Sequence, residues 1–116
     1  MSTTGWMPHV PRATCCALTG IPTHSRLIVS LDQRNASERA NSLLAVPFGS
    51  YGATGPTSKR MEPGETGLPE ASFLKAHFIQ VVEKTSLIEK LPRTLTMRQM
   101  KEVVLMINRA IDPDAA

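Results

Sequence analysis

The feature that most constrains the fold of this chain is a clear helical pattern near its end. In "TMRQMKEVVLMINRAI", residues 96–111, Thr96 and Gln99 have the T-x-x-Q spacing of a capping box. Apolar residues then recur at helical spacing, at Met97, Met100, Val103, Val104, Ile107 and Ile111. The pattern predicts a helix that begins after Thr96, ends before Pro113 and packs one apolar face against the rest of the protein.

The chain before this helix is divided into short segments by prolines and glycines. It contains 9 prolines and 7 glycines in 116 residues, and its apolar runs are strand-like rather than helical. We expect strands within 12–20, 26–31, 42–48, 59–70 and 72–82, a polar turn at 32–41 and a mobile loop at 49–58. Strands followed by one terminal helix predict an α+β fold, with a small antiparallel sheet curled on itself. We expect a flexible N-terminal arm over residues 1–11 and a single domain over 12–116.

The segment "SFLKAHFIQVV", residues 72–82, carries two candidate functional side chains. Strand alternation predicts Lys75 and His77 on one face, together with Phe73, Ile79 and Val81. The next residues, 83–91, read as a short helix that Pro92 stops.

Composition excludes several classes of protein. The two cysteines, Cys15 and Cys16, are adjacent, so there is neither a disulfide framework nor a zinc-ligand set. Aromatic residues make up 4% of the chain, which argues against a single-strand binder built on stacking platforms. The formal net charge of +3 fits contact with phosphate or with an acidic partner. No apolar run approaches the roughly 20 residues needed to cross a bilayer, so we expect no membrane segment. The first residues lack the charged start and apolar middle of a secretory signal, so we expect a cytoplasmic protein. We expect neither a cofactor nor a metal.

Four segments, taken in order, resemble the MazF/PemK family of toxin endoribonucleases from toxin–antitoxin systems. They are "SRLIVSLDQRNA" (25–36), "SLLAVPFGS" (42–50), "GETGLPEASFLKAHFIQVVEKTSLIEKL" (64–91) and "LTMRQMKEVVLMINRAI" (95–111). The resemblance rests on their order and spacing. It implies an SH3-like barrel with a C-terminal helix, a homodimer, and an antitoxin partner whose acidic, flexible tail covers the site.

The resemblance also implies cleavage of single-stranded RNA without a metal. The ribose 2′-hydroxyl attacks the adjacent phosphate, so a base must take one proton, an acid must supply another, and a cation must hold the developing charge.

The sequence departs from the family pattern at the site. The family's arginine before the second strand falls on His24, with Arg26 two positions later, and its threonine after the third strand falls on Gly49, although the following serine is kept as Ser50. On the late strand, an arginine and an aspartate used by some members fall on Lys75 and His77.

Two interpretations of these departures remain open. In the first, the site is rewired, with His24 and His77 as base and acid and Lys75 or Arg26 holding the phosphate, since a free histidine titrates near neutral pH. Ser50, Lys59 and Arg60 would then bind the RNA, although each of these side chains is also compatible with an ordinary solvated role. In the second, the fold persists while cleavage is weak or absent. The chain would then bind RNA or an antitoxin peptide, or inhibit another protein such as DNA gyrase.

Overall fold

Seven antiparallel strands form one curled sheet in the computed structural model, which describes residues 11–18, 24–112 and 114. The strands are β1 (Thr14–Leu18), β2 (His24–Ile28), β3 (Ser42–Gly49), β4 (Ser58–Met61), β5 (Ser72–Lys75), β6 (Gln80–Glu83) and β7 (Leu87–Thr94). Their order is β4-β5-β3-β2-β1-β7, and β6 also pairs with β3. The helices are α1 (Asp32–Ala36), α2 (Pro63–Thr66) and α3 (Met97–Ile111), and single 3-10 turns form η1 (Ala76–Phe78) and η2 (Lys84–Ser86). The predicted 1–11 arm lies outside the described residues, except for Pro11.

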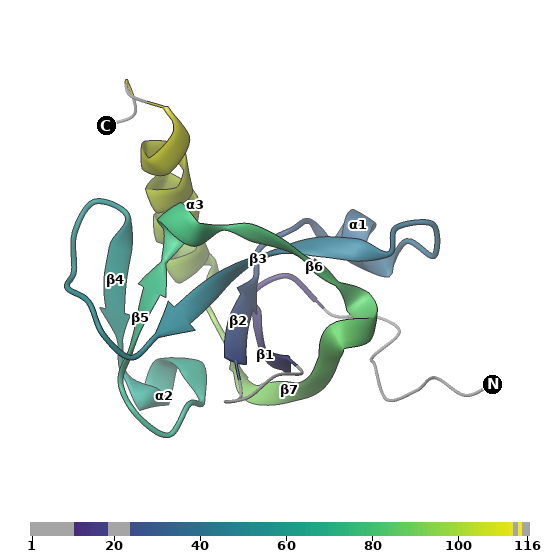
Figure 1. Ribbon diagram of the computed structural model, residues 1–116, viewed down its shortest axis with the longest axis horizontal. Coiled ribbons are helices and arrows are strands. Elements are labelled where there is room, and N and C mark those ends of the chain that lie inside the picture. Colours follow the sequence, from purple (N-terminus) through teal and green to yellow (C-terminus); the bar gives the residue numbers. More distant parts are fainter. Residues whose placement is uncertain (1–10, 19–23, 113, 115–116) are drawn as a thin grey trace.

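The long strand β3 sets the curl of the sheet because it changes partner along its length. Its first half pairs with β6, from Ser42 opposite Glu83 to Ala45 opposite Gln80. Its last two residues pair instead with β5. Figure 1 shows the sheet bending around β3 into a half-barrel, with α3 beside the β4–β5 end. The predicted α+β class, a small curled antiparallel sheet with a C-terminal helix, is confirmed.

The prediction of one continuous strand over residues 72–82 is wrong. It is two strands, β5 and β6, separated by η1. From Leu74 opposite Phe48 to Gln80 opposite Ala45, the later segment advances six residues while β3 advances three, and the extra residues form the turn Ala76–Phe78. The alternation that placed Lys75 and His77 on one face therefore stops at Lys75.

The predicted helix over residues 83–91 is also wrong. The chain makes only the 3-10 turn η2 and then enters strand β7, which continues through Pro92 to Thr94. β7 is the last strand in the sheet order, pairing with β1 through an irregular register. Proline is tolerated in an edge strand because its missing N–H is not needed by a neighbour on that side.

Helix α3 confirms the predicted cap and corrects the predicted apolar face. The Thr96 side chain accepts a hydrogen bond from Gln99 N, and the Gln99 side chain accepts one from Thr96 N. The buried face consists of Met100, Val103 and Met106, with Ile107 packed beside them. Met97, Val104 and Ile111, predicted to face the core, are instead exposed. Met106, which the predicted stripe did not include, belongs to the core.

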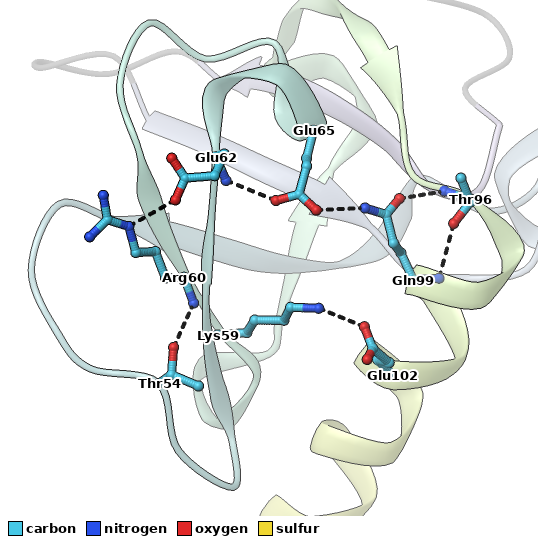
Figure 2. A network of polar contacts seen from close by, with 8 residues as sticks. All are labelled: Thr54, Lys59, Arg60, Glu62, Glu65, Thr96, Gln99 and Glu102. Atoms are coloured by element: carbon cyan, nitrogen blue, oxygen red, sulfur yellow. Dashed lines mark hydrogen bonds and ion pairs between the residues drawn. The ribbon is translucent and has the colours of Figure 1, made fainter.

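A hydrogen-bonded chain joins α3 to α2, the short helix that follows β4. In α2, Glu65 Oε1 accepts from Glu62 N at 2.9 Å, and the helix ends at Gly67, whose φ of 83° favours glycine. The other Glu65 oxygen, Oε2, accepts from Gln99 Nε2 at 3.0 Å. Figure 2 shows the two capping boxes linked end to end through Glu65 and Gln99. The start of α3 is thus fixed against the β4–β5 end of the sheet.

Candidate functional site

The β4–β5–β3 part of the sheet has one face directed at α3. Lys59, Leu74 and Phe48 occupy one row across these strands. Leu74 is fully buried in the core that includes Met100 and Val103 of α3, and Lys59 forms an ion pair with Glu102 of α3 at 2.6 Å. Because neighbouring residues of a strand point to opposite faces, Gly49, Phe73 and Lys75 are directed away from α3.

Lys75 ends β5, and its ammonium group lies over the end of β3. Lys75 Nζ and Cε are each 3.0 Å from the position that a Cβ atom would take at Gly49. Lys75 Cε is also 3.5 Å from the corresponding position at Gly52, whose φ of 145° favours glycine. Lys75 has no ion-pair partner within the described residues. The space left by a missing side chain at Gly49 is therefore filled by a cation without a counter-charge.

Arg26 lies on the same face, on β2. Its cross-strand partner is Pro47, which is two residues from Gly49 along β3 and so shares its face. Arg26 Nε donates to Gln80 Oε1 at 2.7 Å, and one terminal nitrogen donates to the carbonyl of Ser25 at 3.0 Å. Partial burial of the guanidinium lowers the pKa of Arg26 from its ordinary value. These neutral partners orient the guanidinium without cancelling its charge.

His77 lies in η1, beside the start of β4. Its Nδ1 is 3.0 Å from the Thr57 hydroxyl, and its ring packs against Phe78 at a centroid distance of 4.2 Å. The backbone is held at the same place, since Ala76 N donates to Thr57 O at 2.8 Å. The side chain of His77 is exposed. Thr57 therefore engages one ring nitrogen, while Nε2 makes no hydrogen bond within the described residues.

The remaining candidate residues differ in how available they are. Lys59 is paired with Glu102, and Arg60 Nε is 3.0 Å from Glu62 Oε2. Figure 2 shows both ion pairs. Ser50 is exposed directly after Gly49. His24 begins β2 opposite Leu18, and its side chain lies outside the described part of the structure.

The structure places Lys75 and Arg26 on one face and gives His77 a separate neighbour, Thr57. The inference from sequence did not identify Thr57 or Gln80, the residues that hold His77 and Arg26. Thr57 stands 20 residues from His77, and Gln80 stands 54 from Arg26. No local motif signals a contact over such separations, and only the strand register brings these residues together.

Neither a metal-binding cluster nor a membrane-spanning helix is found among the described residues. No group of three or more His, Cys, Asp or Glu side chains there is arranged to hold a metal ion. Of the helices described, none is long and apolar enough to cross a membrane.

Comparison with known proteins gives matches in structure but not in sequence. No family model matches the chain, and no curated protein matches it significantly. A mycobacterial endoribonuclease, solved in complex with its cognate antitoxin, superposes with a TM-score of 0.73 at 23% identity, covering 88% of this chain and 94% of that one. A second structure of a mycobacterial endoribonuclease gives 0.73 at 22% identity, over 89% of this chain and 91% of that one.

The third comparison names the fold. The Mycobacterium tuberculosis toxin MazF-mt6 superposes with a TM-score of 0.74 at 14% identity, over 85% of this chain and 96% of that toxin. At these identities the likeness concerns the fold, and it extends over nearly the whole length of the solved toxins. The resemblance inferred from the order of segments is therefore confirmed at the level of the fold: the chain has the MazF/PemK-like fold of toxin endoribonucleases.

Proposed function

We propose that this chain is the toxin component of a toxin–antitoxin system and cleaves single-stranded RNA in the cytoplasm without a metal. The observation that carries the proposal is the Lys75 ammonium at the end of β3, on the sheet face directed away from α3. It has no ion-pair partner in the described part of the chain, and Arg26 adds a second cation to the same face. A phosphate bound there would supply the missing negative charge.

The reaction requires two proton transfers and a bound phosphate. The ribose 2′-oxygen attacks phosphorus and loses its proton to a base, while the P–O5′ bond breaks and an acid protonates the leaving 5′-oxygen. The products are a 2′,3′-cyclic phosphate and a 5′-hydroxyl. In the proposal, His77 uses Nε2 for one transfer and His24 performs the other. Lys75 and Arg26 stabilise the charge that develops on the phosphate oxygens.

Ser50, Lys59 and Arg60 enter the proposal as outlying contacts to the RNA backbone. Ser50 is adjacent to Gly49 and exposed, so its hydroxyl is close to the proposed phosphate position. Lys59 and Arg60 are already paired with Glu102 and Glu62. A rearrangement would have to release them before they could bind phosphate, which makes them secondary to Lys75.

The direct test is cleavage of mixed messenger RNA by the purified protein in EDTA, with analysis of the new ends. We expect cyclic phosphate and 5′-hydroxyl ends. His77→Ala should reduce the rate by about 10²- to 10⁴-fold, the usual contribution of a general acid or base. Lys75→Ala should reduce it by about 10²- to 10³-fold. Lys101→Ala is the matched control, because Lys101 is exposed on α3. Loss of cleavage in EDTA, or full activity of both site variants, would refute this mechanism.

A second candidate function is a binding module that keeps the toxin fold and has no turnover. It is favoured by one specific observation: Gly49 stands where the family resemblance expects a threonine, so a hydroxyl group is missing from that position. Such a module would bind RNA with an affinity that falls steeply with salt and would release no cleavage products. Measuring RNA binding beside the cleavage assay separates the two candidates, since the binding module would bind RNA and produce no new ends.

The proposed partners are an acidic antitoxin segment and a second copy of the chain. An acidic tail would find uncompensated charge at Lys75 and Arg26. The exposed apolar side chains of Met97, Leu105 and Ile111 on α3 favour association with another surface. Light scattering of the purified chain, alone and with a candidate antitoxin peptide, measures both associations.

A further inference from the structure

Tyr51 is a large aromatic side chain held almost entirely in solvent. It is the only tyrosine of the chain, and 85% of its surface is exposed. It lies in the segment between β3 and β4, two residues after Gly49. Neither the core nor the capping network of Figure 2 uses this ring. The ring is therefore available to a ligand.

The loop that carries Tyr51 is attached to the body at several points. Ser58 Oγ donates to Ala53 O at 2.5 Å, and Arg60 N donates to Thr54 Oγ1 at 3.1 Å, the second contact being drawn in Figure 2. Further along the loop, Arg109 donates to Pro56 O at 3.3 Å. These contacts hold the loop that follows Tyr51 against the rest of the protein.

The start of the same loop lies against the Lys75 side chain. Gly49 and Gly52, at which a Cβ atom would meet Lys75 at 3.0 and 3.5 Å, flank Tyr51 within two positions. At Gly52 a Cβ atom would also lie 3.5 Å from the Phe73 ring, so the backbone packs closely on β5 at this point. The exposed ring of Tyr51 is thus carried by the four residues, 49–52, whose two glycines lie against the Lys75 side chain.

We propose that Tyr51 stacks on an unpaired RNA base next to the phosphate that Lys75 binds. The inference rests on the proposed function and deepens it, because it assigns a base contact to a face where only phosphate contacts had been considered. A base in a duplex is stacked on both sides, so a protein ring reaches its face only in single-stranded RNA. Tyr51 therefore provides a physical reason for single-strand selectivity without reading the sequence.

The test compares binding to two probes of equal length that cannot be cleaved. One is a mixed-sequence 2′-O-methyl oligoribonucleotide, and the other is the same backbone without bases. Binding of the protein to each probe is measured by fluorescence anisotropy. Tyr51→Ala should weaken binding to the first probe by about 5- to 150-fold and leave binding to the abasic probe unchanged. Tyr51→Phe should bind like the wild type, because it keeps the ring.

Lys75→Ala is the contrasting variant. It should weaken binding to both probes and lower the slope of log affinity against log salt by about 0.7, as expected for one lost phosphate contact on a single strand. Tyr51→Ala should leave that slope unchanged. Because Tyr51 is exposed, its variants should melt at the wild-type temperature, which separates a binding effect from unfolding.

The outcomes distinguish the stacking proposal from the function on which it rests. If Tyr51→Ala binds the base-bearing probe as the wild type does, or weakens both probes equally, stacking is refuted while the Lys75 phosphate contact stands. That result would leave the ring for a protein partner instead. If the wild type binds neither probe, the proposed function itself fails.

Discussion

Asn35 illustrates at the scale of a residue how the polar turn after β2 is fixed. Its side chain is fully buried; the carboxamide oxygen accepts from Ser30 Oγ at 2.5 Å, and its nitrogen donates to Ser30 O at 3.0 Å. Ser30 Oγ in turn accepts from Leu44 N at 3.1 Å. The sequence predicted a polar turn here, but it did not indicate that one amide would be enclosed and tie α1 to β2 and β3.

Replacing Asn35 with alanine should lower the free energy of unfolding by about 1–3 kcal/mol, because buried polar groups of Ser30 lose their partner. Urea denaturation of Asn35→Ala measures the change. Gln33→Ala is the control, since Gln33 is exposed on the same short helix. An unchanged urea midpoint for the Asn35 variant would contradict this account.

The Lys59–Glu102 pair gives a pH prediction. The hydrogen bond and positive charge of Lys59 lower the pKa of the Glu102 carboxyl, so the folded state favours its ionised form. A lowered carboxyl pKa stabilises the fold above the unfolded-state pKa, and this contribution is lost as pH falls through the folded-state pKa. The melting temperatures of wild type and Glu102→Gln should therefore differ slightly at pH 7 and converge in acid. A gap that widens in acid would reverse the assigned sign.

The same pair explains why charge alone could not identify the site. Lys59 and Arg60 are adjacent basic residues beside a Gly-rich loop, which in sequence resembles an RNA-binding pair. Glu102, which neutralises Lys59, lies 43 residues further along the chain. Only the packing of α3 against β4 shows that the charge of Lys59 is neutralised by Glu102. Lys75 has no such partner among the described residues.

Among the elements, α3 was the one whose presence and bounds were predicted best. The face that it buries was not predicted correctly. The cap at Thr96 and the bounds of the helix follow from local chemistry. Residues 103–107 are all apolar, however, so helical spacing allows more than one stripe. The contacts with Leu74 and the rest of the core select Met100, Val103 and Met106.

Two methionines on this helix test the selection directly. Met100 is 2% exposed and Met97 is 80% exposed. Met100→Ala should cost about 2–5 kcal/mol of unfolding free energy, whereas Met97→Ala should remain within about 0.5 kcal/mol of the wild type. Chemical denaturation of the pair compares the same substitution on two faces of one helix. Equal losses would show that the helix is packed in a different rotation.

The segment from 72 to 94 marks the limit of prediction for the strands. Its apolar alternation is continuous, but its register against β3 shifts by three residues between β5 and β6, and its partner then changes to β1. A change of partner is a property of the sheet and has no local signal. For this reason η1 and the edge strand β7 were missed.

For the whole molecule, the order of strands and helix was sufficient to predict the curled sheet with a terminal helix. The two faces of that sheet were not predictable, because they depend on register. One face is filled by α3, and the other carries Lys75 and Arg26 without counter-charges in the described part of the chain. The proposed RNA cleavage requires RNA to occupy this second face.

Lysine footprinting measures that occupancy most directly. The protein is acetylated briefly with and without a mixed-sequence 2′-O-methyl RNA, and the modification of each lysine is quantified by mass spectrometry. Bound RNA is expected to protect Lys75 and to leave Lys101, exposed on α3, as reactive as before. Protection of Lys101 with unchanged reactivity of Lys75 would place the RNA on the α3 side of the sheet. That result would contradict RNA binding at the face that carries Lys75 and Arg26.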